Sequence, residues 1–126
     1  MSPRGSDEPT GAGEDWLFPY EAALHEVVPS VHEAQNAWLS QIDSLGAPDR
    51  KTHELIRMVC LVALRNSQGV ELHAMLAAEV GASWEEVAGS IVLTEPAFGL
   101  LPAAEALPWA RKGWETGRAT LDEGAP

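Results

Sequence analysis

The sequence predicts an all-α protein, and three observations carry that prediction. Apolar residues recur every three or four positions through most of the chain, and no stretch alternates convincingly with a period of two. Residues that favour helix ends stand at the boundaries of the apolar segments. The chain has 126 residues, a length that suits one domain with one sizeable core.

The first half of the chain predicts three helices. A short helix over residues 20–28 is stopped by Pro29, and a second covers residues 30–45 before Gly46. A third spans residues 50–65, and Asp49 precedes it as a good N-cap. Its middle, LIRMVCLVAL, is apolar nearly all round, so we expect this helix to be the central, buried one.

The second half predicts three more helices, which makes a bundle of about six. The first covers residues 68–81 and ends at Gly81. Ser83, followed three residues later by Glu86, is a capping-box signature for the start of the next helix. That helix ends near residue 95. The last helix begins near Pro102, where proline is well tolerated, and Pro108 should kink or split it.

Composition sets the expected limits of the domain. Residues 1–15 are rich in Gly, Pro, Ser and acidic residues and are predicted to be a disordered tail, residues 16–117 a single helical domain, and residues 118–126 a frayed tail. No run of apolar residues is long enough to span a bilayer, and the N-terminal residues lack the apolar segment of a signal peptide.

Charge and cysteine content narrow the function classes. A formal net charge of -11 repels phosphate backbones and anionic lipid, so we expect neither a nucleic-acid partner nor a membrane partner. Cys60 is the single cysteine, which excludes an intrachain disulfide and fits a reducing cytoplasm. Its apolar surroundings favour a small core residue.

Three segments in register carry a resemblance to a known family. PDRKTHEL (48–55) is similar to the LDRKTREL opening of a long helix. LHAMLAAEVGASWEEV (72–87) is similar to an LH…AL…GAT.EEI block. AFGLLPAAEAL (97–107) is similar to an FGG.PAA..A stretch. From Leu45 to about Ala104 the chain therefore resembles the carboxymuconolactone decarboxylase family, which includes the alkylhydroperoxidase D proteins. The resemblance implies the helical fold of that family and a homo-oligomer, a trimer or a hexamer.

The resemblance also implies which branch of the family the chain is like. The peroxidase branch has a glutamate, two cysteines and a histidine at a spacing that falls here on Glu54, Asn66, Gly69 and His73. Because no thiol stands at the two cysteine positions, thiol peroxidase activity is not expected. The decarboxylase branch lacks the cysteines and works without metal or organic cofactor. The implied function is a cofactor-independent lyase of aromatic-compound metabolism, acting on a small ring-derived carboxylic acid or lactone.

The chemistry of such a lyase suggests roles for four residues. A proton must reach the carbon that loses carbon dioxide, and the imidazole of His73 can deliver it. Glu54 could orient that imidazole if the third and fourth helices pack side by side. Arg50 and Arg57 lie four residues before and three after Glu54, on the same side of the helix, and could dock a substrate carboxylate.

Each of these assignments has a structural alternative. His73 could be a core histidine, and Arg50 with Glu54 an ordinary surface pair. Asn66 and Gly69, at the start of the fourth helix, could contact substrate or form a capping turn, which we favour for Asn66. His53 is expected to face solvent. No metal site is expected from His53, Glu54 and His73, because no pair among them has the i, i+4 histidine spacing of a helical zinc site.

The function classes also stay open. The same acid–base pair could serve an isomerase, a cyclase or a dehydratase in a biosynthetic pathway. A non-catalytic oligomer that binds a small ligand or a partner protein is the alternative outside enzymes. The departures from the family motifs, His53 and the segment GLL at residues 99–101, leave the identity of the substrate open.

Overall fold

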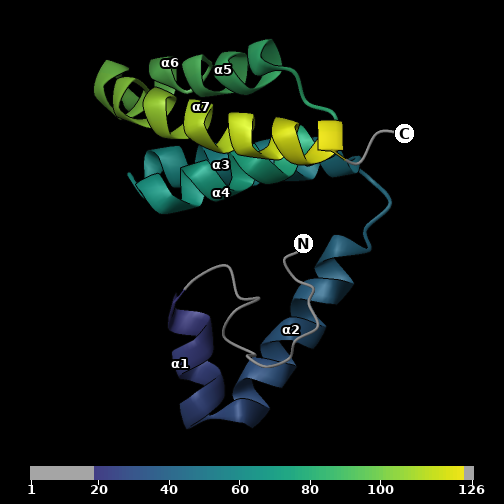
Figure 1. The fold of residues 1–126 in the computed structure, drawn as a ribbon. Coiled ribbons are helices and arrows are strands. Elements are labelled where there is room, and N and C mark those ends of the chain that lie inside the picture. The colour runs from purple at the N-terminus through teal and green to yellow at the C-terminus, as the bar shows by residue number, and fades with distance from the viewer. Residues whose placement is uncertain (1–18, 124–126) are drawn as a thin grey trace. The chain divides into compact units, whose positions relative to one another are not determined.

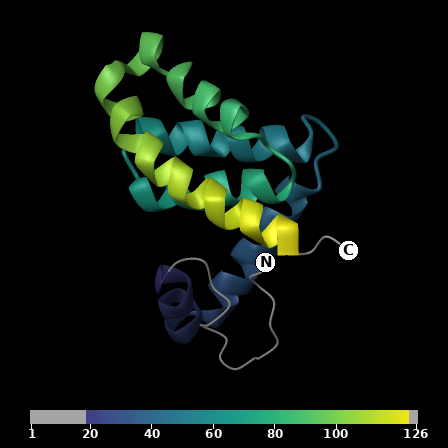
Figure 2. The same cartoon turned by 45° about the horizontal axis from the view of Figure 1, so that its top comes forward.

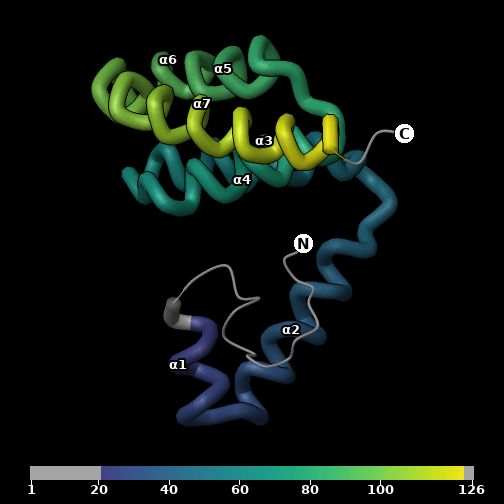
Figure 3. Tube along the Cα trace, viewed as in Figure 1, coloured from purple at the N-terminus to yellow at the C-terminus, as the bar shows by residue number. Residues whose placement is uncertain are grey.

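The computed structural model describes residues 19–123, and every regular element in that range is a helix. This confirms the predicted all-α class. Figure 1 shows the helices as ribbons and Figure 3 traces the same path as a tube. The tail predicted over residues 1–15 lies outside the described residues. The chain divides after Leu45 into two compact units, where the sequence predicts a single domain over residues 16–117.

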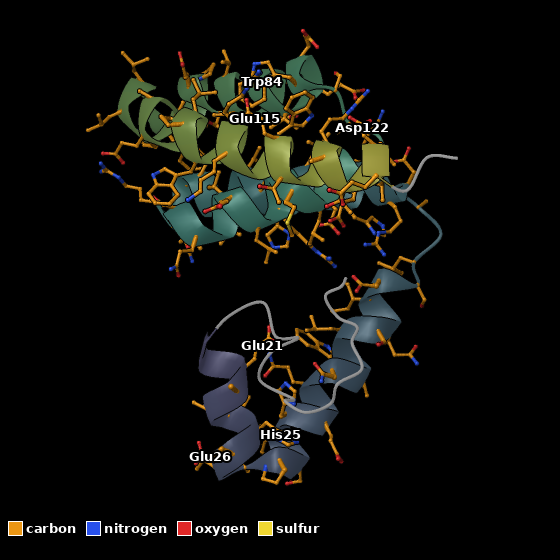
Figure 4. The ribbon with its side chains drawn as sticks, viewed as in Figure 1. Glu21, His25, Glu26, Trp84, Glu115 and Asp122 are labelled. Atoms are coloured by element: carbon orange, nitrogen blue, oxygen red, sulfur yellow. The ribbon has the colours of Figure 1, made fainter. Side chains whose placement is uncertain are left out.

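The first unit is a helical hairpin of α1 (Pro19–Val27) and α2 (Pro29–Asp43). Pro29 starts α2, where its missing amide leaves no hydrogen bond unmade. The ring of His25 on α1 meets that of His32 on α2 edge-on, with 5.5 Å between the centroids. Figure 4 shows His25 beside Glu21 and Glu26 on the short helix α1. Trp38 is exposed on α2.

The second unit contains α3 (Arg50–Ala63), α4 (Ser67–Glu79), α5 (Trp84–Val92), the short α6 (Glu95–Phe98) and α7 (Leu100–Glu123). Helix α4 packs along α7 and beside α3, and α5 packs on α7 (Figures 1 and 2). One core joins these helices, and its fully buried members include Met58, Val62, Val70, Ala74, Val87, Ile91 and Ala103. Apart from α6, the helices match the six that the sequence predicts.

Helix α3 is not the central buried helix that its apolar sequence predicts. Met58 and Val62 are buried, but Ile56 and Cys60, one turn apart, are exposed, and the expectation that Cys60 is a core residue is wrong. The central helix is α4, whose small residues are buried between α3 and α7. In a bundle this small, α3 is covered on one face only, and the apolar residues beyond that face remain on the surface.

The close approach of α4 and α7 depends on two glycines one turn apart. A Cβ atom on Gly113 would lie 2.0 Å from the backbone oxygen of Glu71, and one on Gly117 would lie 2.2 Å from that of Met75. Both distances are far below van der Waals contact, so a side chain at either position would push the helices apart. These glycines position α4, which carries His73.

Local capping follows the sequence prediction closely. Asp49 caps α3 by accepting a 2.8 Å hydrogen bond from the Thr52 amide, and hydrogen bonding by Thr52 lowers the pKa of the Asp49 carboxyl. Ser83 and Glu86 form the reciprocal capping box of α5. Gly81 follows α4 with a φ of +100°, a backbone conformation that glycine adopts without strain.

Helix α7 differs from the prediction in two ways. It continues past Pro108 as one helix instead of splitting, and it runs to Glu123, so the segment 118–123 is helical where a frayed tail was expected. Pro108 removes a backbone donor from the carbonyl of Ala104, and because Ala104 is exposed, water can replace that donor.

Candidate functional site

The site begins with the helical spacing of α3. Arg50, Glu54 and Arg57 follow one another at intervals of four and three residues, which places them on one side of the helix. Because the Asp49 cap starts α3 at Arg50, these residues occupy its first two turns. Helix α4 packs beside α3, and His73 lies on its second turn.

Glu54 is the centre of a four-residue cluster. Its Oε1 lies 2.8 Å from Nδ1 of His73, and its Oε2 lies 3.0 Å from Nη2 of Arg50 and 3.8 Å from Nη1 of Arg57. One carboxylate oxygen therefore contacts the imidazole and the other contacts both guanidinium groups. The pairing of α3 with α4 that the chemistry requires is present.

Burial is graded across the cluster. The Glu54 side chain is 1% exposed, His73 16%, Arg57 29% and Arg50 49%. The carboxylate lies within the bundle while the imidazole and the guanidinium groups extend from it toward the surface. An incoming anion can therefore reach the cations without meeting Glu54 first.

The hydrogen bond to Glu54 sets the tautomer of His73. A carboxylate only accepts hydrogen bonds, so Nδ1 of His73 donates and carries the proton. In the neutral ring, Nε2 is then the nitrogen that can take up a proton, and in the charged ring it is the one that can give a proton away. The geometry equips His73 for proton transfer at one defined atom.

Asn66 and Gly69 lie at the junction of α3 and α4. The side-chain oxygen of Asn66 accepts a 2.9 Å hydrogen bond from the Gly69 amide, so the cap that we favoured for Asn66 is present. A Cβ on Gly69 would lie 2.6 Å from a terminal methyl carbon of Leu61, so a larger residue here would require that side chain to shift. Contact of Asn66 and Gly69 with a substrate stays a prediction.

A surface depression lies beside this junction. Its lining includes Arg65 from the turn after α3, Asn66 and Val70 from α4, and Glu105 from α7. Arg65 and Glu105 form a two-pronged ion pair across it, with Nε of Arg65 2.9 Å from Oε1 of Glu105. Asn66 is thus on the wall of a depression, although neither His73 nor Glu54 is among its lining residues.

His53 is the residue whose environment the sequence analysis missed. It was expected to face solvent, yet it is 7% exposed, and neither ring nitrogen has a hydrogen-bond partner. Helical spacing alone puts His53 at the edge of the apolar face of α3, and only the fold shows that the ring is buried. A signal was present in the motif itself, because His53 departs from the family sequence LDRKTREL.

Among residues 19–123, no three or more His, Cys, Asp or Glu side chains are grouped so as to hold a metal ion. Within the same residues, no helix is both long enough and apolar enough to cross a membrane.

The fold and the cluster together define an all-helical protein with a buried glutamate–histidine pair next to two arginines. Comparison with protein families agrees with that class. The model of the carboxymuconolactone decarboxylase family matches residues 29–112, two thirds of the chain, and the chain belongs to this family. No curated protein and no solved structure gives a significant match.

Proposed function

We propose that the protein is a cofactor-independent lyase that removes carbon dioxide from a small ring-derived carboxylic acid or lactone. The observation that carries this proposal is the 2.8 Å contact between Glu54 and Nδ1 of His73, with Arg50 and Arg57 at the other oxygen of Glu54. The family match supports the same class of reaction.

The arginines supply the docking group in this proposal. A guanidinium carries five N–H donors, so one arginine can hold Glu54 and a substrate carboxylate together. Two guanidinium groups therefore meet at one spot on a chain of net charge -11. Such a spot favours an anionic ligand over a neutral one.

The proposed reaction uses the imidazole as the proton carrier. The bond between the ring carbon and the substrate carboxylate breaks, carbon dioxide leaves, and the electron pair stays on the ring carbon, delocalised onto an adjacent carbonyl oxygen. Protonated His73 then gives the proton on Nε2 to that carbon. Glu54 stabilises the imidazolium before the transfer and keeps the ring oriented after it. Water returns the proton to His73.

A screen followed by a product assay tests the proposal. The purified protein would be mixed with small lactones and ring-derived carboxylic acids, and ligands that raise its melting temperature would be assayed for release of carbon dioxide. A ligand at a hundred times its Kd should stabilise the fold by about 2.7 kcal/mol. Ligands that bind and release carbon dioxide support the proposal. Bound ligands that are rearranged or dehydrated without release would replace the lyase by another acid–base enzyme.

We further propose that the protein is a homo-oligomer, a trimer or a hexamer. Exposed apolar side chains support this. They lie on α3, just after α3 and α5, on α6 and at the start of α7, and they include Ile56, Leu64, Leu93, Phe98 and Leu100. Light scattering coupled to size-exclusion chromatography measures the mass directly. A mass of three or six chains is expected, and a mass of 13.5 kDa, that of one chain, would overturn the proposal.

A further inference from the structure

The most exposed large apolar side chains of the second unit gather at one end of it. Five are more than half exposed, from 56% for Phe98 to 79% for Leu93, and the other three are Leu64, Leu100 and Leu101. They follow α3 and α5, lie on α6 and begin α7, and these segments meet at one end of the helices in Figures 1 and 2. We call these five residues the apolar end. A contiguous exposed cluster of this kind marks an interaction surface.

The depression beside the junction of α3 and α4 belongs to the same surface. Leu64 precedes Arg65 and Leu101 precedes Pro102, and both Arg65 and Pro102 line the depression. Most of the remaining wall is apolar: Leu61, Val62, Val70 and Ala106. The depression has about 200 Å³ of space, part of it open to solvent. An enclosed apolar cavity of about 150 Å³ holds a benzene molecule, so this hollow has room for the tip of one apolar side chain.

Protruding side chains beside a hollow make the surface self-complementary. Across a twofold axis, a side chain of one copy enters the hollow of the other, and the reverse contact forms at the same time. The apolar end therefore has the shape that binding a second copy of itself requires.

Charge also favours a second copy at this end. A chain of net charge -11 repels its own copies over most of its surface. The segments 61–70 and 93–106 contain three charged residues, Arg65, Glu95 and Glu105, and Arg65 pairs with Glu105. Two copies that meet through the apolar end therefore bring little net charge together.

The exposed apolar area is of the size that a stable interface needs. Full burial of one large apolar side chain removes roughly 60–120 Å² from water, so five that are more than half exposed present roughly 200–450 Å². Each partner of a standard interface buries about 800 Å², a little over half of it nonpolar. The apolar end thus supplies about half or more of the nonpolar area that one partner contributes.

We propose that the apolar end is a twofold interface, at which it binds the same surface of a second copy of the chain. The inference rests on the proposed homo-oligomer and refines it. A trimer has no twofold axis, whereas a hexamer of two trimers has, so the apolar end would join one trimer to the other. The ion pairs between Arg65 and Glu105 would lie at the rim of this contact.

One charge at the apolar end tests the contact. Leu101→Glu places a carboxylate at an exposed position in the first turn of α7, where the helix dipole favours an acid, so the fold should be kept. Circular dichroism checks the fold, and light scattering coupled to size-exclusion chromatography measures the mass. The expected result is six chains for the wild type and three for Leu101→Glu. Leu121→Glu, in the last turn of α7, is the matched control and should keep six chains.

A disulfide test does not depend on dissociation. A twofold interface brings residues near its axis next to the same residues of the other copy. In a Cys60→Ser background, a single cysteine would be placed in turn at each of the five positions of the apolar end, and the protein would be oxidised with copper phenanthroline. At least one position should give a disulfide-linked dimer of otherwise wild-type mass. Val80→Cys, just after the other end of α4, should give none.

Either of two outcomes would overturn the inference: a folded Leu101→Glu protein with the wild-type mass, or no linked dimer from any of the five positions. If instead Trp38→Glu on α2 separates the copies and Leu101→Glu does not, the α1–α2 hairpin makes the contact and the inference also fails.

The wild-type mass separates this inference from the proposals on which it rests. A wild-type trimer would overturn the inference and leave the homo-oligomer standing. A dimer that Leu101→Glu splits into single chains would support the inference and overturn the trimer or hexamer, and a wild-type mass of one chain would overturn both. None of these readouts involves turnover, so failure of the lyase proposal leaves the inference intact.

Discussion

Glu54 illustrates how one side chain can hold a site together. Its carboxylate is almost completely buried and is compensated by contacts to the His73 imidazole and to two guanidinium groups. A buried carboxylate without such partners would be unstable, so the cluster is a structural unit as well as a candidate reaction centre. Its stability and its chemistry can therefore be tested with the same residues.

The first prediction concerns the charge of Glu54. Glu54→Gln keeps the size and one hydrogen-bond acceptor but removes the negative charge that contacts Arg50 and Arg57, so we expect the free energy of unfolding to fall by about 1–3 kcal/mol. Urea denaturation followed by circular dichroism measures it. A variant as stable as the wild type would show that the cluster contributes nothing to the fold.

The second prediction separates docking from stability at Arg50. Because this side chain is half exposed, its pair with Glu54 should contribute only about 0.5 kcal/mol, so Arg50→Gln should fold normally. Its KM for a carboxylate substrate should rise about tenfold or more. Arg118→Gln is the matched control, since Arg118 is equally exposed and also pairs with an acid four residues on. Equal KM values for the two variants would remove Arg50 from the docking site.

At the scale of helices, the packing of α7 on α4 decides where His73 lies. Gly113 and Gly117 permit contact between the helices at the backbone of Glu71 and Met75, which flank His73 on either side. On the other side of α7, the guanidinium carbon of Arg111 lies 4.9 Å from the ring centroid of Trp84 and 5.1 Å from that of Trp114. Arg111 also pairs with Glu115. Figure 4 labels Trp84 and Glu115. Helix α7 is thus held between α4 and α5.

The third prediction tests this close packing. Gly113→Ala places a methyl group against the Glu71 carbonyl and should lower the free energy of unfolding by about 1–3 kcal/mol or more. Gly89→Ala is the control, because Gly89 lies inside α5 with open space around it, and alanine there should stabilise the fold by about 0.5–1 kcal/mol. Thermal denaturation of both variants measures the contrast, and a loss of stability in both would contradict the packing argument.

The fourth prediction concerns pH and the ion pair between α7 and the turn after α3. The hydrogen bond from Arg65 lowers the pKa of the Glu105 carboxyl, so this group favours the folded state at neutral pH. That contribution is complete above the pKa of an unfolded glutamate and is lost as the pH falls from about 5 to about 3. Glu105→Gln should therefore lose less stability over this interval than the wild type. Parallel urea titrations at several pH values would reveal the difference, and identical slopes would contradict it.

The sequence predicted the helices better than their packing. Caps such as Asp49 and Ser83 act through hydrogen bonds within a few residues, so local sequence is enough to place them. Burial depends on which helices pack together, and periodicity could not show that Cys60 is exposed or that His53 is buried. The length of α7 was underestimated, because its last residues were expected to fray, and Pro108 was expected to kink or split a helix that is continuous.

Part of the candidate site could be predicted from spacing within one helix. The residues Arg50, Glu54 and Arg57 share one helix, so their common side follows from spacing alone. Their meeting with His73 depends on the packing of α3 beside α4, which spacing does not give and the family resemblance implied. The burial of His53 could not be predicted from spacing, because it depends on which helices pack against α3.

At the scale of the whole molecule, the family match extends across both compact units. It begins at residue 29, in α2 of the first unit, and ends at residue 112, within α7 of the second. The His73–Glu54 cluster and the core that supports it belong entirely to the second unit. The proposed acid–base chemistry would therefore reside in the helices that follow Leu45.

The most direct test of acid–base catalysis is the turnover of His73→Gln. It would be measured with the substrate that the screen provides, together with the turnover of Glu54→Gln and of the double variant. The account predicts that His73→Gln lowers kcat by about 100-fold or more and changes KM little, because without the imidazole the ring carbon must take its proton from water. The double variant should be no slower than His73→Gln alone, since Glu54 acts through the imidazole. A folded His73→Gln protein that turns over the substrate at the wild-type rate would contradict the account.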